Sequence, residues 1–206
     1  MGAGTAPYNK FLTHLNYISH DFGEYSGEKL GGGTEYAAIN IKSDITSIPL
    51  TSASIDYVIC TEVLEHVPAP ILALGEIARL LKKDGILILT APMTGAIHQE
   101  PYHFYGGFSP YFFKYIATLF NLNLISLEAH GNYLRFLAQE LSRLNGIYEE
   151  LGLKFNIKSN IDNLKSNLSE LANELISVES SLSANQIDAA GINRFSIGYW
   201  IILRKL

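Results

Sequence analysis

The sequence predicts an α/β fold in which a mostly parallel, doubly wound sheet carries helices on both faces. Over the first 130 residues, short runs of β-type composition alternate with helical stretches, which is typical of a parallel sheet with covered faces. Residues 85–91 (Gly-Ile-Leu-Ile-Leu-Thr-Ala) are also apolar at nearly every position, as expected of a strand buried on both sides. Together these two observations indicate the fold class.

Five strands and three helices are expected in this part of the chain. The expected strands are residues 16–22, 36–42, 55–60, 85–91 and 123–128. The expected helices are residues 7–15, 70–82 and 110–120. Each helix has a proline near its first position, where a missing N–H costs no hydrogen bond.

Beyond Gly131 the sequence changes character. Two long helices are expected at 133–151 and 159–183, followed by a last strand at 194–203. We therefore predict a single domain over residues 1–206. It comprises a core at 1–130, a helical insertion at 132–190 and a final strand at 194–204.

The second long helix carries an apolar seam that continues for about three heptads. Its members are Ile161, Leu164, Leu168, Leu171, Leu175, Val178 and Leu182. We expect this seam to pack on the preceding helix or on the sheet, because three heptads are short for a coiled coil. A homodimer or partner contact through helix 159–183 is the alternative.

The composition favours a globular, cytoplasmic protein. The 206 residues are 48% hydrophobic and carry a net charge of −5, and this acidic balance argues against a nucleic-acid-binding surface. The single cysteine, Cys60, lies in an apolar run, where we expect its side chain to be buried. One cysteine cannot form an internal disulfide, so we expect a protein of a reducing compartment. No apolar stretch approaches the roughly 20 residues that span a bilayer, and the N-terminus lacks the layout of a signal peptide.

A glycine-rich turn at residues 2–7 (Gly-Ala-Gly-Thr-Ala-Pro) leads into the first expected helix, a geometry that brings backbone N–H groups close to a ligand. Asp21 follows near the spacing of about 20 residues at which a carboxylate meets ribose hydroxyls. Pro7 occupies the position of the third glycine in dinucleotide-binding turns, which disfavours a nicotinamide-dependent oxidoreductase. An adenosine with a small amino-acid tail fits this turn better.

Four motifs in order resemble the class I S-adenosylmethionine-dependent methyltransferases, and among them the type 11 methyltransferase domain. They are the turn at 2–5 with Asp21, the segment 43–49 (Ser-Asp-Ile-Thr-Ser-Ile-Pro), the segment 54–67 and the segment 76–92. The family's usual Lys-Pro-Gly-Gly turn is here Lys82-Lys83-Asp84-Gly85. The resemblance covers residues 2 to about 130. It implies a Rossmann-like fold, S-adenosyl-L-methionine as the cofactor and methyl transfer to a small-molecule acceptor.

The resemblance also implies roles for individual residues around the cofactor. It places Gly2 and Gly4 of the turn, together with Asp21, at the ribose. It places Asp44 and Ile45 at the adenine, and Thr61 and Glu62 at the methionine end of the cofactor.

Methyl transfer is an in-line displacement, so the enzyme mainly aligns an acceptor about 3 Å from the methyl group. A hydroxyl or ammonium acceptor also needs a base, and His66 is the candidate, although a structural role for this histidine is at least as common. The aromatic segment 98–111, with His98, Tyr102 and His103, is expected to shape the acceptor site or to form a lid over it. We expect no metal, because His98 and His103 lie on a proline-containing loop and no third ligand has a typical spacing.

The chain departs from the family pattern at its beginning. The family's first strand precedes the glycine turn, whereas this chain begins at Met1, where that strand would end. We expect a start assigned too late rather than a truncated relative, because the downstream cofactor motifs are intact. The alternative function is a catalytically degenerate, methyltransferase-like partner or regulatory subunit.

Overall fold

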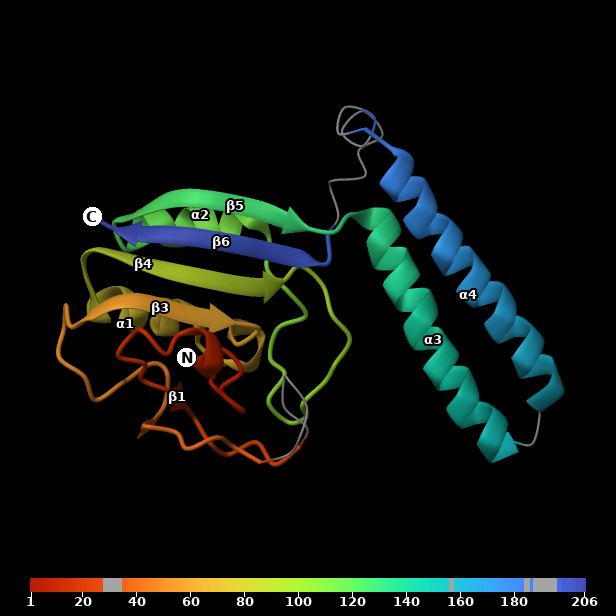
Figure 1. Cartoon of the computed structure of the whole chain (residues 1–206), viewed down its shortest axis with the longest axis horizontal. Coiled ribbons are helices and arrows are strands. Elements are labelled where there is room, and N and C mark those ends of the chain that lie inside the picture. The colour runs from red at the N-terminus through yellow and green to blue at the C-terminus, as the bar shows by residue number, and fades with distance from the viewer. Residues whose placement is uncertain (28–34, 156–157, 184–185, 187–195) are drawn as a thin grey trace. The chain divides into compact units, whose positions relative to one another are not determined.

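The computed structural model describes residues 1–27, 35–155, 158–183, 186 and 196–206. The chain divides into two compact units (Figure 1). The first unit is residues 1–128 with residues 198–206, and the second is residues 129–197.

The first unit contains two sheets. The smaller sheet pairs β1 (His20–Asp21) with β2 (Ile41–Lys42) in parallel. The larger sheet has the order β3-β4-β6-β5, and its strands are β3 (Ile55–Thr61), β4 (Leu81–Pro92), β5 (Leu122–His130) and β6 (Gly198–Lys205). Strands β3 and β4 are parallel, whereas β6 runs antiparallel to β4. The predicted α/β class with a mostly parallel sheet is therefore confirmed.

Two helices, α1 (Pro70–Leu80) and α2 (Pro110–Leu119), lie on one face of the larger sheet (Figure 1). Both begin at the prolines that predicted them. The prediction of a helix at 7–15 is wrong. Only the short 3-10 helix η1 (Asn9–Phe11) forms there. This short helix buries no residue, so no packing stabilises a longer helix. Within the described part of this unit, the helical cover predicted for the second face is therefore not found.

The first two predicted strands are much shorter than expected. Residues 16–22 and 36–42 contribute only the pairs His20 with Ile41 and Asp21 with Lys42. No second neighbour extends this ladder among the described residues, and an isolated pair of strands is marginally stable. The last strand begins at Gly198 rather than at 194, and residues 194–195 lie outside the described residues.

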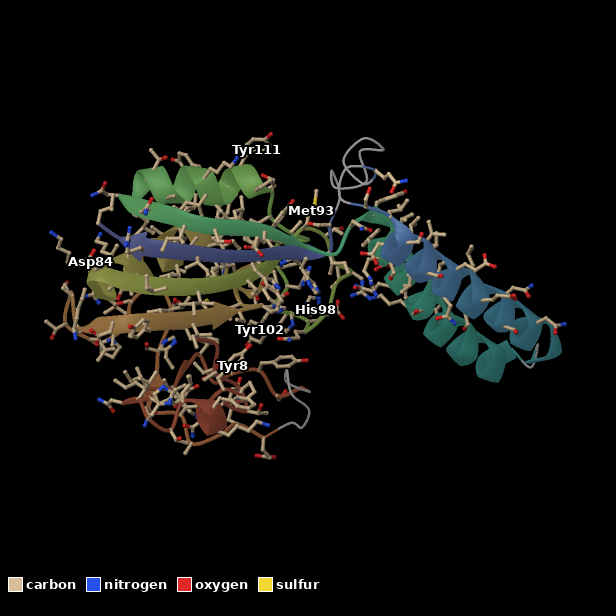
Figure 2. The ribbon with its side chains drawn as sticks, turned by 45° about the horizontal axis from the view of Figure 1, so that its top comes forward. Tyr8, Asp84, Met93, His98, Tyr102 and Tyr111 are labelled. Carbon is tan, nitrogen blue, oxygen red and sulfur yellow. The ribbon has the colours of Figure 1, made fainter. Side chains whose placement is uncertain are left out.

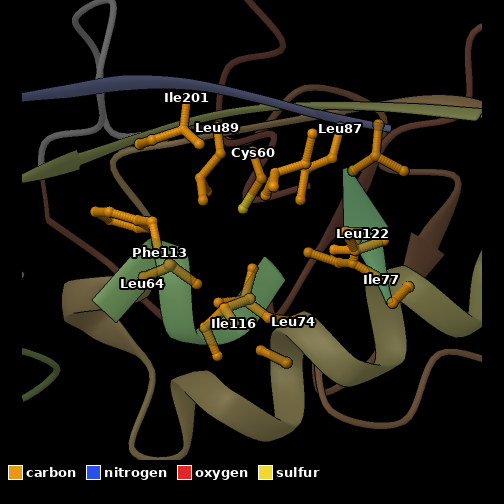
Figure 3. Packing of buried hydrophobic residues seen from close by; sticks show 14 of the residues in the cluster. Cys60, Leu64, Leu74, Ile77, Leu87, Leu89, Phe113, Ile116, Leu122 and Ile201 are labelled. Carbon is orange, nitrogen blue, oxygen red and sulfur yellow. The ribbon is translucent and has the colours of Figure 1, made fainter. Parts of the chain in front are cut away.

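The hydrophobic core fills the space between the larger sheet and its two helices (Figure 3). Leu87 and Leu89 project from β4 onto Leu74 and Ile77 of α1 and onto Phe113 of α2, and all five side chains are fully buried. Alternate positions of β4 are buried, as expected of a strand with one covered face. The free Cys60 is buried in the same core, which confirms the sequence-based expectation.

An ion pair on α1 holds the loop that precedes β3. Nε of Arg79 donates to Oε2 of Glu76 across 2.7 Å, and Nη1 of Arg79 donates to the carbonyl of Leu50 across 2.9 Å. Oε1 of Glu76 accepts from the N–H of Ile48 at 2.7 Å. The loop carrying Asp44 and Ile45 is thereby fixed to α1.

The second unit contains α3 (Tyr133–Phe155) and α4 (Lys158–Ser181), which pack against each other. Glu179 of α4 accepts hydrogen bonds from Arg135 and Asn132. Ala138 and Ala172 are buried, whereas Leu171 and Val178 of the apolar seam are exposed. The side chains of Ile161 and Leu164 lie outside the described residues, and pairing of this helix with a second copy stays a prediction. Within the described ranges, no helix combines the length and apolar character that crossing a bilayer requires.

Candidate functional site

The glycine turn is held between the two sheets of the first unit. The N-terminal ammonium of Met1 donates to the carbonyl of Ile59 in β3, and the N–H of Ala3 donates to the carbonyl of His20 in β1. Gly2 and Gly4 both have positive φ angles, of 64° and 50°. A Cβ on Gly2 would lie 2.3 Å from Cγ2 of Val63, so the loop after β3 can approach only a glycine. These contacts fix the turn beside the carboxyl ends of β1 and β3.

Asp21 joins the turn at the end of β1. Its Oδ2 accepts the N–H of Gly4 at 2.8 Å, and its Oδ1 accepts the N–H of Gly23 at 2.9 Å. The side chain of Tyr36 also hydrogen-bonds to Asp21, and an ionised carboxylate has about four lone-pair positions, so acceptor capacity for a ligand hydroxyl is left. The turn and the acid predicted to meet a ribose therefore lie at one point.

The two residues predicted to meet the adenine differ in accessibility. Asp44 is exposed, and its Oδ1 accepts both the N–H and the hydroxyl of Thr46 at 2.8 Å. Ile45 is only 8% exposed and belongs to the hydrophobic core. Asp44 can therefore reach a ligand, whereas the side chain of Ile45 already packs against protein.

Thr61 ends β3 and Glu62 follows it, next to an aromatic residue, Tyr8, that was not predicted from the sequence. The hydroxyls of Tyr8 and Thr61 lie 3.2 Å apart. Glu62 has a positive φ of 51°, and its Oε1 accepts the hydroxyl of Thr90 at 2.8 Å. The sequence assigned Tyr8 to a helix at 7–15. This helix does not form, and the hydroxyl of Tyr8 lies beside Thr61 instead.

The loop after β4 lies beyond the carboxyl ends of the strands. Figure 2 shows Tyr102, His98 and Tyr8 near the arrowheads of β3 and β4, and Asp84 at the opposite end of the sheet. The Tyr102 ring makes edge contacts with Phe22 and Tyr25, at centroid distances of 6.1 and 6.5 Å. Tyr102 therefore connects the predicted acceptor loop to the segment that follows Asp21.

The same loop is fastened to the short 3-10 helix η2 (Leu64–His66) after β3. The N–H groups of Phe104 and Tyr105 both donate to the carbonyl of Glu65, at 2.8 and 3.2 Å. Nδ1 of His66 lies 2.7 Å from the carbonyl oxygen of Tyr102. These bonds bring histidines from two separate loops together.

Three histidines meet at this junction. The ring centroids of His66 and His98 are 4.8 Å apart, those of His98 and His103 are 4.5 Å apart, and those of His66 and His103 are 5.7 Å apart. The argument against a metal depended on the lack of a third ligand with suitable spacing. His66 brings a third imidazole from a loop that sequence spacing cannot relate to the other two, and the absence of a metal stays an untested prediction.

Burial controls the protonation of this cluster. Burial raises the pKa of Glu65 to about 8, and the Glu65 side chain is only 1% exposed. Burial, reinforced by the neighbouring His98 and His103, lowers the pKa of His66 against the opposing effect of its bond to Tyr102. Burial and His98 also lower the pKa of His103. His66 and His103 are thus neutral at pH 7, with nitrogen lone pairs available.

An apolar cavity of about 440 Å³ lies beside the far end of the same loop. Its walls include Ile71, Leu72, Tyr105, Phe108 and Phe112. Tyr105 and Phe108 belong to the aromatic segment 98–111 that was predicted to shape the acceptor site, whereas His98, Tyr102 and His103 do not line the cavity. The cavity therefore borders the far end of that segment, apart from its histidines.

With this geometry in place, the chain can be compared with known proteins. A family model described as a methyltransferase domain matches residues 1–89, which is less than half of the chain. Over these residues the chain is similar to that family. No curated protein matches the chain.

Solved structures of methyltransferases share the fold of this chain. A SAM-dependent methyltransferase from Archaeoglobus fulgidus is 14% identical with a TM-score of 0.55, over 99% of this chain and 83% of that one. One from Methanosarcina mazei is 12% identical with a TM-score of 0.52, over 100% of this chain and 90% of that one. At these identities the likeness establishes the Rossmann-like fold.

Two features of residues 1–89 bear on binding of a cofactor such as S-adenosyl-L-methionine, namely the glycine turn and Asp21. The turn has positive φ angles at Gly2 and Gly4, and the missing Cβ at Gly2 makes room for the side chain of Val63. The Asp21 carboxylate is anchored beside that turn with acceptor capacity to spare. Both features belong to the part of the chain that the family model matches.

Proposed function

We propose that this chain binds S-adenosyl-L-methionine at its glycine turn and transfers the methyl group to a small-molecule acceptor held by the loop after β4. The observation that carries the proposal is the 2.8 Å hydrogen bond from Gly4 to Asp21, which unites the turn and the acid in one binding element. Asp21 would accept the ribose hydroxyls, and Asp44 would accept the adenine amino group. Thr61 and Glu62 would line the methionine end.

The bound cofactor supplies an activated sulfonium methyl, so the protein chiefly has to align the acceptor. His98, Tyr102 and His103 are the proposed acceptor-binding residues, because their loop covers the carboxyl ends of β3 and β4. The Tyr102 ring borders the segment after Asp21, which supports a position next to the cofactor. The aromatic character of this loop favours an acceptor with apolar surface as well as a nucleophilic atom.

The base stays a prediction. His66 donates through Nδ1 to the Tyr102 carbonyl, so Nε2 is the atom that would accept a proton from the acceptor. The lowered pKa of His66 keeps this atom unprotonated at neutral pH.

Calorimetric titration of the chain with S-adenosylhomocysteine tests the proposal. We expect one site in the wild-type chain and at least tenfold weaker binding by Asp21→Asn, which keeps the shape but removes the charge. Asp56→Asn is the matched control, because Asp56 is an exposed aspartate paired with Lys82 on β4. Equal binding by wild type and Asp21→Asn would refute the assignment of Asp21.

The degenerate partner subunit is the alternative function. The described residues include no strand that pairs β1 with β3, and this split of the sheet at the cofactor edge is the observation in its favour. If the wild-type chain binds neither S-adenosylhomocysteine nor S-adenosylmethionine, this alternative takes the place of the proposed enzyme.

A further inference from the structure

The three histidines place one nitrogen each around a common point. These nitrogens, from His66, His98 and His103, all lie within 4.8 Å of one another. A tetrahedral ion with zinc-like bond lengths holds its nitrogen ligands about 3.4 Å apart. The three nitrogens would therefore have to move closer together around such an ion, and His98 is the exposed member of the trio.

The hydrogen bonds of two rings engage Nδ1 and leave Nε2 as the possible metal ligand. Nδ1 of His66 faces the carbonyl of Tyr102 at 2.7 Å, and Nδ1 of His98 faces the carbonyl of Ala96 at 2.9 Å. A carbonyl only accepts, so each Nδ1 carries the hydrogen and each neutral ring presents the lone pair of Nε2. Metal-ligating histidines characteristically show this arrangement, in which a backbone carbonyl fixes the tautomer and the ring orientation.

Two buried polar groups at the cluster lack a partner. Both ring nitrogens of His103 are inaccessible to solvent and have no hydrogen bond within the described part of the chain. Oε2 of the buried Glu65 also has none, and Oε1 of Glu65 lies 3.7 Å from Nε2 of His66. Unpartnered buried groups are costly. A cation at the centre of the trio would give His103 a partner and would lie near the carboxyl group of Glu65.

We propose that His66, His98 and His103 bind a divalent transition-metal ion of the zinc class. Three imidazoles are a donor set that such ions prefer over Mg²⁺ or Ca²⁺. Three protein ligands leave a fourth position open, as in zinc sites that bind water or a substrate. The site goes beyond the proposed methyl transfer, because its ligands belong to the acceptor loop and η2 and not to the cofactor residues.

This site competes with the predicted base for one atom. A metal on Nε2 of His66 takes the lone pair that would accept a proton. With metal bound, His66 is therefore a ligand, and any deprotonation of the acceptor would depend on another group.

The test is direct metal binding by the full chain after removal of metals by chelation. We expect calorimetry to show one equivalent of Zn²⁺. We also expect Co²⁺ to give the visible absorption of a tetrahedral complex, which Zn²⁺ then displaces. His98→Ala and His103→Ala should each weaken Zn²⁺ binding by at least tenfold and remove the Co²⁺ absorption. His14→Ala is the control, because His14 is exposed and outside the trio, and it should bind as wild type does.

Zn²⁺ should also raise the unfolding temperature of wild type and of His14→Ala, but not that of His98→Ala. Absence of a stoichiometric Zn²⁺ site in wild type, or equal affinity in wild type and His98→Ala, would overturn the proposal. A variant that fails to fold leaves the Co²⁺ spectrum of wild type to decide, since its absence also overturns the proposal. These measurements contain no cofactor, so failure of the proposed methyl transfer does not affect them.

Discussion

The N–H of Gly4 donates to Oδ2 of Asp21 across 2.8 Å, although the two residues are 17 positions apart. This bond joins a glycine turn to the end of β1, and the N–H of Ala3 reinforces it through the carbonyl of His20. The two motifs therefore act as one element, and a disturbance of the turn also displaces the acid.

Gly2→Ala should destabilise the protein. The added Cβ would meet Val63 at 2.3 Å on a residue with positive φ, and the β-branched Val63 is too stiff to yield easily. We expect a loss of about 1–3 kcal/mol in the free energy of unfolding, measured by urea denaturation. Gly95→Ala is the control, since its nearest neighbour would be the carbonyl oxygen of Gly106 at 3.9 Å. Equal stability of the two variants would contradict this account of the turn.

Cys60 should be inert in the folded protein. Its side chain is fully buried, and burial raises the pKa of its thiol to about 11, so little thiolate exists at pH 8. We expect an aromatic disulfide reagent to label no thiol in the native state and one per chain in guanidinium chloride. Rapid labelling without denaturant would show that the core at β3 opens readily.

The Glu76–Arg79 pair should make stability depend on acid pH. Hydrogen bonding to Arg79 lowers the pKa of Glu76 below its ordinary 4.5. The contribution of the ionised carboxylate is therefore complete above about pH 4.5 and disappears as the pH falls through the lowered value.

The measurement for this pair is the difference in unfolding free energy between wild type and Glu76→Gln from pH 7 down to pH 3. We expect a constant difference above pH 5 that shrinks below it. Asp56→Asn, which removes an exposed pair with Lys82, should change little at any pH. A difference that grows toward low pH would have the wrong sign.

Phe113→Ala should be strongly destabilising, because Phe113 is fully buried between α2 and the sheet. Removal of a buried phenyl ring costs about 3–5 kcal/mol, which thermal or urea unfolding would detect. Tyr111→Ala on the same helix is the control, since Tyr111 is 73% exposed and should have a small effect. A similar loss in both variants would indicate an effect on helix α2 rather than on the core.

The candidate site could be predicted only in part. Asp21 was found because the spacing of a glycine turn and an acid is a local property, and the structure places both at one point. Tyr8 was missed because the turn-rich segment 7–15 resembles a helix until its lack of packing is known. The convergence of the three histidines was missed because it depends on bonds between two loops more than thirty residues apart in the chain.

The sequence by itself determined the α/β class, helices α1 and α2 and the parallel strands β3 and β4. Periodicity, proline positions and a continuous apolar run are local signals that packing then reinforces. Only the tertiary structure decided the two-residue lengths of β1 and β2, the single helical face of the larger sheet in its described residues, and the meeting of His66 with His98 and His103. These features depend on neighbours that are distant in the chain, and no local pattern of side chains records such neighbours.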